Sequence, residues 1–573
     1  MGRTFVGVVI CIVSLAASIM AQGHGDRFAI SIESHDQGWT QTCYNSNADE
    51  YLVVWEDYRG DACDVYGQFV GGDGTLKGSN FAIAAAAGHQ AWPRLDFDPV
   101  NDRVLVVFEH HDQSTADVRG VFVNANGTFY DAPTSLEDHT FGICTNPARI
   151  YTCSVAFNPE AGRYLAVWGD FRNDPTSASF TGADVYGQLI DADGTLLPPP
   201  SPADPSTNFA IATSPDIYES VADVTFSMGT CEWFVVYGTS TGLVCGQRVD
   251  LGGDLIDQNG GETATPAPIV VSKPFQNGPD CFQARVKANC EGLLDQSGWY
   301  ECEVVWKGKA PALADNDVWG QRIGFFNDAG IWVAKYVGID GAVTDTICNH
   351  PISIQNDWVG SPDIDYSVQD NEFLVAWGDP RTNGWSGQDL YYQRLWIDTS
   401  QGPRMVMLAD DRLNTVTETE NIPVFTTPAY EGSLLGIAHS VTRNEFLVGF
   451  TYVGEDADNN DIMGVIAHGS PPVNADDAPL VDDLLLGPCT PNPFGSTTTI
   501  RFNLPRPGAA TVTIRDLMGR TVATLAAGVR EAGPHAVLWE GTDERGVPLG
   551  SGVYLCGVRF DGRLSTQMVS LIR

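Results

Sequence analysis

The chain has 573 residues, of which 43 % are hydrophobic, and this is enough for one large repeat structure or for several domains. Its formal net charge of −40 argues against a nucleic-acid ligand, because nucleic-acid phosphates require lysine and arginine. Beyond the N-terminus no stretch approaches the roughly 20 apolar residues that span a bilayer, so we expect no transmembrane segment in the mature chain.

The first residues have the pattern of a secretory signal. Arg3 supplies the positive charge, residues 5–17 are apolar, and small residues follow, so we predict a signal peptide at 1–21 and export through Sec. Of 13 cysteines, only Cys11 lies within it. An oxidising compartment favours disulfides. The candidate pairs, whose connectivity the sequence leaves open, are Cys231 with Cys245, Cys144 with Cys153, and Cys290 with Cys302.

A strand–turn–strand pattern then organises most of the chain. Residues 51–59 (YLVVWEDYR) and 64–68 (DVYGQ) are rich in residues that favour strands, with turn residues between them. The pattern returns at 103–123, 163–190, 231–249, 302–323, 372–395 and 445–467. Repetition of all-β units at this length is typical of a propeller. We therefore predict a seven-bladed β-propeller over residues 22–469.

Each repeat reads as four strands. An inner strand precedes the pattern, as at 93–99, 153–158 and 362–366, and a fourth strand closes the unit, as at 80–84 and 208–212. Residues 28–31 resemble a fourth strand but come before the first repeat. We predict that they pair with the seventh repeat near 461–467 and close the ring, because closure removes two open strand edges.

The repeated residues are predicted to be architectural. One aromatic per repeat should pack each blade on the next, namely Trp55, Phe108, Trp168, Tyr237, Trp306, Trp377 and Phe450. An Asp before the third strand is expected to cap a turn in six of the copies. The pairs Asp57/Arg59, Asp170/Arg172 and Asp379/Arg381 are interpreted as turn salt bridges, and the alternative is a ring of arginines around a pocket.

Catalytic chemistry is not indicated by any motif. The sequence has no nucleophile elbow, no HExxH and no phosphate loop, so no catalytic or cofactor-binding residue is assigned and enzymatic activity stays open. The plan resembles the sialidase-like extracellular propellers, but their Asp-box is absent. Insertions at 173–183 and 250–300 are candidate binding loops. Asp456, Asp458 and Asn460 open like a calcium loop but lack its later Gly and Glu, so an acidic surface turn is the alternative.

The last part of the chain differs in charge and pattern. Residues 470–483 are predicted to be a linker, and residues 484–573 an Ig-like β-sandwich. The sandwich contains nine Arg, no Lys and six Asp plus Glu, which gives 9 − 6 = +3, so the rest of the chain carries −40 − 3 = −43.

This module resembles the type A C-terminal sorting domain of type IX secretion substrates, and also the Ig-like domain of flagellar hook-capping proteins. The resemblance rests on the order of short motifs along the module, in which the key residues are Pro491, Asn492, Pro493, Gly519, Gly552 and Tyr554. It implies passage through outer-membrane secretion machinery to the cell surface or the medium. The tail 567–573 lacks the family's Lys-Lys run, and Cys489 and Cys556 are unusual there and form a further candidate disulfide.

These features together predict an all-β protein, a seven-bladed propeller followed by a small Ig-like sandwich. The function expected first is that of a secreted or cell-surface binding propeller with an unknown glycan or protein ligand, exported through its C-terminal domain. The alternatives are a glycan-active extracellular hydrolase or lyase, and a structural surface or adhesion protein. No cofactor is indicated apart from the calcium candidate.

Overall fold

The computed structural model describes residues 27–573 except 61, 113–115, 145–148, 174–181, 199–207, 215–216, 262–266, 273–281, 290–298, 310–315, 329–330, 354–358, 368–370, 381–388, 399–403, 409–420, 426–429, 454–459, 469–484, 487–488, 490–491, 493, 505–506, 517–520, 531–532, 551 and 561–562. The described residues form antiparallel sheets and contain no helix, so none of them belongs to a helix that could cross a membrane. The predicted signal peptide lies outside the described residues.

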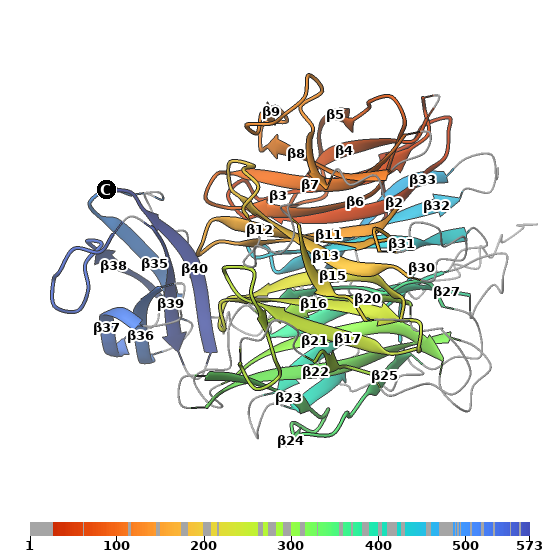
Figure 1. The fold of residues 1–573 in the computed structure, drawn as a ribbon. Coiled ribbons are helices and arrows are strands. Elements are labelled where there is room, and N and C mark those ends of the chain that lie inside the picture. The colour runs from red at the N-terminus through yellow and green to blue at the C-terminus, as the bar shows by residue number, and fades with distance from the viewer. Residues whose placement is uncertain are drawn as a thin grey trace, which may run out of the picture.

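Seven sheets form the blades of a propeller (Figure 1). Blade 1 contains β2 (Gln37–Asn45), β3 (Glu50–Asp57), β4 (Asp64–Gly71) and β5 (Leu76–Ala84). Blade 2 contains β6 (His89–Asp98), β7 (Arg103–His111), β8 (Ala116–Asn124), β9 (Phe129–Tyr130) and β10 (Phe141–Cys144). Blade 3 contains β11 (Ile150–Asn158), β12 (Arg163–Asp170), β13 (Asp184–Asp191) and β14 (Phe209–Ala212).

The remaining blades follow the same plan. Blade 4 contains β15 (Glu219–Ser227), β16 (Glu232–Thr239), β17 (Val244–Val249), β18 (Leu255–Ile256) and β19 (Ile269–Val270). Blade 5 contains β20 (Phe282–Ala288), β21 (Trp299–Lys309), β22 (Asn316–Asp328), β23 (Ile331–Val337), β24 (Val343–Thr344) and β25 (His350–Ser353). Blade 6 contains β26 (Asp363–Ser367), β27 (Glu372–Asp379), β28 (Asp389–Asp398), β29 (Arg404–Leu408) and β30 (Ile422–Phe425). Blade 7 contains β31 (Tyr430–Ser440), β32 (Glu445–Val453) and β33 (Asn460–His468).

The outer edge of several blades differs from the expected single fourth strand. In blades 2, 4, 5 and 6 the third strand pairs with two separate segments, for example β8 with both β9 and β10. In blade 1 the single strand β5 makes both contacts through a register shift between Gly67 and Phe69. The segment 250–300, which the sequence analysis treated as an insertion, contains the outer strands β18 and β19 of blade 4 and the inner strand β20 of blade 5.

The ring closes as the sequence predicted. Strand β1 (Phe28–Ser31) pairs antiparallel with β33, with Phe28 opposite Gly464 and Ala29 opposite Met463. The N-terminal strand thus forms the outer edge of blade 7, and in Figure 1 β32 and β33 lie beside the strands of blade 1. The pairing covers the edge of β33 that an unclosed repeat would leave open.

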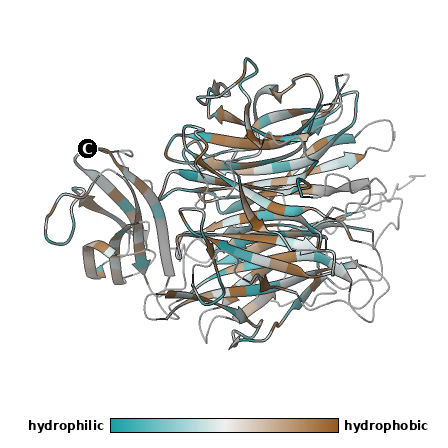
Figure 2. Ribbon diagram, viewed as in Figure 1, coloured by the Kyte–Doolittle hydropathy of each residue, from teal (hydrophilic) through white to brown (hydrophobic). Residues whose placement is uncertain are grey.

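A separate hydrophobic cluster fills each of the seven junctions between neighbouring blades, including the one between blades 7 and 1. Each cluster contains one of the seven repeated aromatics, and these side chains are at most 2 % exposed. Hydrophobic segments recur along the strands of the propeller (Figure 2). The predicted packing role of the aromatics is confirmed.

The C-terminal module has two sheets of its own. One contains β34 (Leu485–Leu486), β35 (Thr498–Leu504) and β38 (Gly533–Trp539). The other contains β36 (Gly508–Asp516), β37 (Thr521–Arg530), β39 (Gly552–Phe560) and β40 (Arg563–Leu571). A cluster around Phe494, Trp539 and Tyr554 fills the space between them. The Tyr554 hydroxyl donates to the Gly550 carbonyl four residues upstream at 2.9 Å, in the manner of the tyrosine corner of Ig folds.

The cysteine predictions need correction. No disulfide joins any two of the ten described cysteines. Cys231 lies just before β16, whereas Cys245 pairs with Tyr237, about 20 Å farther along the hairpin. The Cys231 thiol instead donates to Glu160 at 2.7 Å. The predicted disulfide Cys231–Cys245 was therefore wrong, because the two residues lie on one hairpin but are not opposite each other in its ladder.

The other candidate pairs have different outcomes. Cys144 and Cys153 share one blade junction but form no disulfide, and their thiols contact different groups, Asp170 and the Trp92 carbonyl. Cys302 forms no disulfide with another described cysteine, and its predicted partner Cys290 lies outside the described residues. Cys489 and Cys556 are free but hydrogen-bonded to each other in the module core.

Candidate binding site at the propeller axis

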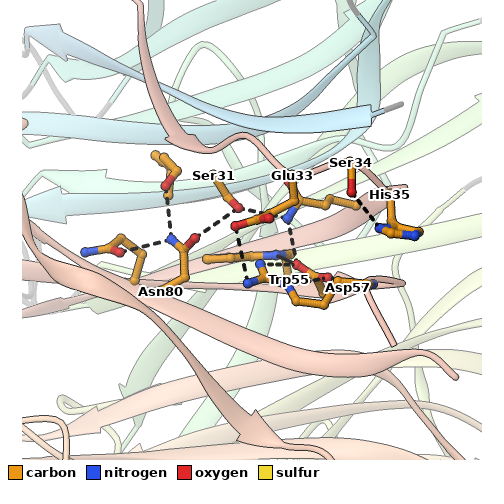
Figure 3. A network of polar contacts seen from close by, with 11 residues as sticks. Ser31, Glu33, Ser34, His35, Trp55, Asp57 and Asn80 are labelled. Atoms are coloured by element: carbon orange, nitrogen blue, oxygen red, sulfur yellow. Dashed lines mark hydrogen bonds and ion pairs between the residues drawn. The ribbon is translucent and has the colours of Figure 1, made fainter. Parts of the chain in front are cut away.

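The repeated ion pairs belong to the turns, as predicted. The Trp55 indole donates to Asp57 at 2.9 Å, and Arg59 donates to both oxygens of the same carboxylate at 2.8 and 2.6 Å (Figure 3). In blade 3, Asp170 accepts from the Trp168 indole at 3.0 Å and from Arg172 at 2.6 Å. The alternative of an arginine ring around a pocket is not supported by Arg59 and Arg172, and Arg381 lies outside the described residues.

In blades 1 and 3 the described turn caps come from another Asp than the one predicted from the sequence. Asp57 and Asp170, at the ends of second strands, accept the backbone N–H of Arg59 and Arg172 at 2.9 and 2.8 Å. We had given this role to the Asp that begins the third strand. In blade 1 that residue, Asp64, instead lies opposite Asp57 in the ladder. The hydrogen bonds need an Asp two residues before the donating N–H, and the end of the second strand provides it.

A second repeated device joins the outer strands of neighbouring blades. The buried Gln of the third strand accepts from an Asn that also donates to a carbonyl of the preceding blade. For Asn80 these bonds reach Gln68 at 3.0 Å and the Ile30 carbonyl of β1 at 3.2 Å, so this link includes the closing strand (Figure 3). The same link recurs at Asn208, Asn349 and Asn421. It too is architectural.

The inner strands share a bulge near their first residues. The register shifts between Gly38 and Gln41 in β2, and an equivalent shift occurs in β6, β11, β15, β20 and β31. Bulged residues have positive φ at Trp39 (50°), Trp92 (57°), Thr152 (46°) and Gln283 (61°). Positive φ is strained for bulky residues and is kept mainly where function or packing requires it. Four inner strands therefore carry a residue with a positive φ at the bulge.

The register beyond the bulge defines seven equivalent positions, which we call the inner ring. In the ladder between the first and second strands of a blade, each inner-ring residue lies opposite the residue that precedes the repeated aromatic. Its members, in blade order, are Gln41, Arg94, Ser154, Asp223, Arg285, Asp363 and Gly436. Whereas the aromatic position keeps one chemistry in all seven blades, the inner ring mixes cations, anions, amide, hydroxyl and glycine.

The inner-ring carboxylates are held by the neighbouring inner strand. Asp223 accepts from the Ser154 hydroxyl at 2.7 Å and from the Val286 N–H at 3.0 Å. Asp363 accepts from the Ile437 N–H at 3.0 Å. Burial raises the pKa of Asp363 to about 6 in spite of the nearby Arg285 and Arg94. These carboxylates thus contribute to blade-to-blade bonding.

The two arginines are less completely paired. Arg285 is 7 % exposed, donates to the Ala284 carbonyl at 3.1 Å and lies 3.8 Å from an Asp363 oxygen. Arg94 donates to the Pro93 carbonyl at 3.3 Å and has no ion pair among the described residues. Burial, followed by repulsion from Arg285, lowers the pKa of Arg94 to about 10. Both arginines line a small, partly open pocket with Trp39, Gln41, Gln283 and Ser361, and its volume of about 10 Å³ is room for about one water.

A row of aromatic rings continues from this pocket. The Trp39 and Trp92 rings lie 3.9 Å apart, and Trp92 and Tyr151 lie 5.5 Å apart, so three successive blades each contribute one half-buried ring. Glu56 positions Trp92 by accepting its backbone N–H at 2.7 Å. Burial raises the pKa of Glu56 to about 7.

The residues named from the sequence lie elsewhere. Asp456 and Asp458 are outside the described residues, and Asn460 begins β33, so the calcium candidate stays a prediction. Among the described residues no cluster of three or more His, Cys, Asp or Glu could hold a metal. Most of the insertion at 173–183 is likewise outside the description. Sequence reasoning missed Arg94, Arg285 and Trp39, because no repeat pattern marks them.

The proposed sorting residues are partly described. Asn492 accepts the Ser570 N–H at 2.7 Å, and Gly552 pairs with Leu571 at the start of β39. Tyr554 lies in the module core. Pro491, Pro493 and Gly519 lie outside the described residues. The described motif residues thus hold the last strand of the module in place.

Comparison with known proteins adds a domain family and distant fold relatives. Residues 492–560 match the family described as FlgD Ig-like domain. No curated protein matches the chain. One similar solved structure is PorZ, a surface component of the type-IX secretion system of Porphyromonas gingivalis, with 12 % identity and a TM-score of 0.33 over 92 % of this chain. The chain spans 58 % of the length of PorZ.

Two further structures belong to glycan-related proteins. A mutant of Trypanosoma rangeli sialidase displaying trans-sialidase activity has 9 % identity and a TM-score of 0.34, over 96 % of this chain and 94 % of its own. The six-bladed, fucose-recognising lectin of Aleuria aurantia has 7 % identity and a TM-score of 0.31, over 66 % of this chain and 97 % of its own. At such low similarity these structures carry no conclusion about ligand or activity.

Proposed function

We propose that this chain is a secreted or cell-surface binding propeller, exported through Sec and then through outer-membrane machinery that recognises the C-terminal module. One observation carries the binding part. The repeated aromatics and Asn–Gln links hold blades together and the repeated ion pairs hold turns, whereas the inner ring differs from blade to blade and borders a pocket with two incompletely paired arginines. Positions that vary on a rigid scaffold are those that can be fitted to a ligand.

The binding proposal is tested with the whole mature chain. Labelled protein is applied to glycan and protein arrays, beside the variant Arg94→Gln, which changes the pocket without breaking a described ion pair. We expect a selective set of ligands that Arg94→Gln weakens. A folded protein that retains no ligand on either array would instead favour the alternative of a structural surface or adhesion protein.

The delivery proposal rests on the motifs of residues 484–573 and on the family match at 492–560. Removing 484–573 in the source bacterium should leave the propeller in the periplasm, as measured by cell fractionation. Full-length Arg94→Gln serves as the control and should be exported normally. If the truncated chain reaches the surface at normal yield, the module is an ordinary Ig-like domain for attachment or spacing.

An extracellular hydrolase or lyase is the second candidate, and one observation favours it. Asp363, which with Asp223 is one of two inner-ring carboxyls, has a pKa raised by burial to about 6, and this value is suited to proton transfer near neutral pH. Its bond to the Ile437 N–H gives it a structural role as well. Incubation with the array ligands decides the question. Release of new sugar ends by the wild type but not by Asp363→Asn would support catalysis, and intact ligands would exclude it.

A further inference from the structure

We infer that Cys489 and Cys556, two thiols in the core of the C-terminal module, become joined by a disulfide once the chain has left the cytoplasm. The bond fastens the first segment of the module to its second sheet. This inference concerns a covalent modification that the binding function does not use. It rests on the export part of the proposed function, because disulfides form and persist in oxidising compartments.

Two contacts place Cys489 beside Cys556. Both side chains are buried, and the two thiols are hydrogen-bonded to each other. The Cys489 N–H also donates to the Gln567 side chain at 3.1 Å, and Gln567 lies opposite Cys556 in the ladder between β39 and β40. The two sulfur atoms therefore need to approach only from hydrogen-bond distance to the S–S length of about 2 Å.

The segment that carries Cys489 crosses from one sheet of the module to the other. At its start, β34 pairs with β35 of the first sheet. At its end, Phe494 bridges to Leu571 of β40, an edge strand of the second sheet, and the Phe494 N–H donates to the Ser570 carbonyl at 2.9 Å. Cys489 lies between these two anchors, and Cys556 lies on β39 beside β40. The disulfide would therefore connect this crossing segment to the interior of the second sheet.

The surroundings of the two cysteines resemble those of a structural disulfide. In antibody domains the disulfide links the two sheets and packs against a buried tryptophan. Here Cys489 and Cys556 belong to the same core cluster as the buried Trp539. Small secreted domains often use disulfides because their hydrophobic core alone is small. A covalent link between the sheets would supply the module with the same kind of support.

The position of the crossing segment sets the order of the reaction. Because both thiols are buried, an oxidant reaches them as the module folds or as the segment opens locally, and Cys489 on the segment is then exposed first. Its thiolate attacks the disulfide of a thiol oxidoreductase and displaces one thiol. The Cys556 thiol then loses its proton and attacks the Cys489 sulfur, which releases the second thiol. The chain loses two protons and two electrons in all, and the oxidoreductase disulfide becomes a dithiol.

The place of the bond determines what it does. The predicted linker ends at residue 483, directly before β34, so the crossing segment is the first part of the module that follows the propeller. Any opening of the module that begins at this end must separate Cys489 from Cys556. The disulfide would therefore suppress local opening of the crossing segment and of the strand β40 that it covers.

The first experiment maps the bond in the full mature chain. Reduced, unfolded protein is refolded in oxidised and reduced glutathione, remaining thiols are alkylated in urea, and the peptides are analysed by mass spectrometry without reduction. We expect the peptides of Cys489 and Cys556 to be linked to each other. Cys144 and Cys153 share a blade junction, but their thiols contact Asp170 and the Trp92 carbonyl, so this internal control should remain alkylated.

The second experiment measures the effect of the bond by amide hydrogen exchange. Peptides that cover β34 and β40 should exchange about tenfold more slowly or better in the oxidised chain than in the chain reduced with dithiothreitol. The double variant Cys489→Ser/Cys556→Ser should exchange at one rate with and without dithiothreitol. The matched control Cys144→Ser removes a buried thiol of the propeller and should keep the difference between oxidised and reduced protein.

The inference is overturned if both thiols are alkylated after refolding with oxidised glutathione, if Cys489 bonds to another cysteine, or if oxidation leaves the exchange unchanged. Protein taken from the source bacterium extends the test. The exported chain should carry the linked peptide, whereas a chain without residues 1–21 should carry two thiols, and two thiols in the exported chain would also overturn it. Cell fractionation measures export separately, so linked protein that stays in the periplasm would refute the proposed delivery and support the disulfide.

Discussion

The blade junctions and the inner ring are built from the same seven repeats, but they use repetition in opposite ways. At the junctions one aromatic per blade occupies the same buried position in all seven clusters. The residue just before each aromatic pairs with an inner-ring residue on the first strand of the same blade. This inner-ring position differs in chemistry from blade to blade. Repeated positions therefore hold the ring together, whereas the inner ring combines two carboxylates that bond to neighbouring blades with positions that can be fitted to a ligand.

The largest test of this comparison removes the closing strand. Deletion of residues 22–32 takes away β1 and its pairing with β33, and it opens the cluster around Ile30. The unfolding free energy should fall by about 5 kcal/mol or more, because buried apolar surface and hydrogen bonds are lost together. Urea unfolding measures it, and deletion of 22–26 alone is the control. Equal midpoints for both deletions would mean that the ring does not depend on closure.

A junction variant and an inner-ring variant sharpen the comparison. Trp168→Ala empties the centre of one cluster and should cost about 3–5 kcal/mol. Arg94→Gln should cost less than about 1 kcal/mol, since no described ion pair is lost. Both are compared by urea unfolding. A similar loss of unfolding free energy in the two variants would show that the junction aromatic and the inner-ring residue do not differ in their role in stability.

The pH dependence of stability tests the residue that holds Trp92. Burial raises the pKa of Glu56 from 4.5 to about 7, so the folded state retains a proton that the unfolded state releases. The stability that this group contributes is complete below pH 4.5 and is lost as the pH rises toward 7. Glu56→Gln keeps an acceptor for the Trp92 N–H and removes the titration.

The advantage of Glu56→Gln over the wild type should therefore grow between pH 4.5 and 7.5, by about 3 kcal/mol at most. Thermal unfolding across this range measures the difference, and the exposed Glu137→Gln is the control. A constant difference at every pH would show that Glu56 is not held in a buried, protonated state.

The smallest effect concerns the cysteines and leaves stability almost unchanged. The buried thiols of Cys43, Cys144, Cys153, Cys245 and Cys302 should resist alkylation in the native protein and react after unfolding without a reductant. Peptide mass mapping locates the labels. Cys489 and Cys556, already hydrogen-bonded, are the pair that mild oxidation should join. Thiols that stay unreactive in the unreduced, unfolded chain would restore the disulfides predicted from the sequence.

Much of the fold could be predicted because the repeats carry it. The strand pattern, the aromatic at each junction and the displaced strand at 28–31 all follow from residues that recur at matching places. The inner ring could not be found in this way, because an irregular bulge separates it from the start of each strand and only the ladder register reveals the equivalence of Arg94 and Arg285. The same dependence on register explains why Cys231 and Cys245 were paired wrongly.

The most direct test of the central claim measures binding and stability in the same samples. Wild type, Arg94→Gln and Trp168→Phe, all as full mature chains, are compared on the glycan and protein arrays and by thermal unfolding. The account predicts that Arg94→Gln unfolds like the wild type but loses ligand, whereas Trp168→Phe unfolds at a lower temperature and, while folded, keeps its ligand profile. The opposite assignment, with ligand binding intact in Arg94→Gln and lost in folded Trp168→Phe, would contradict it.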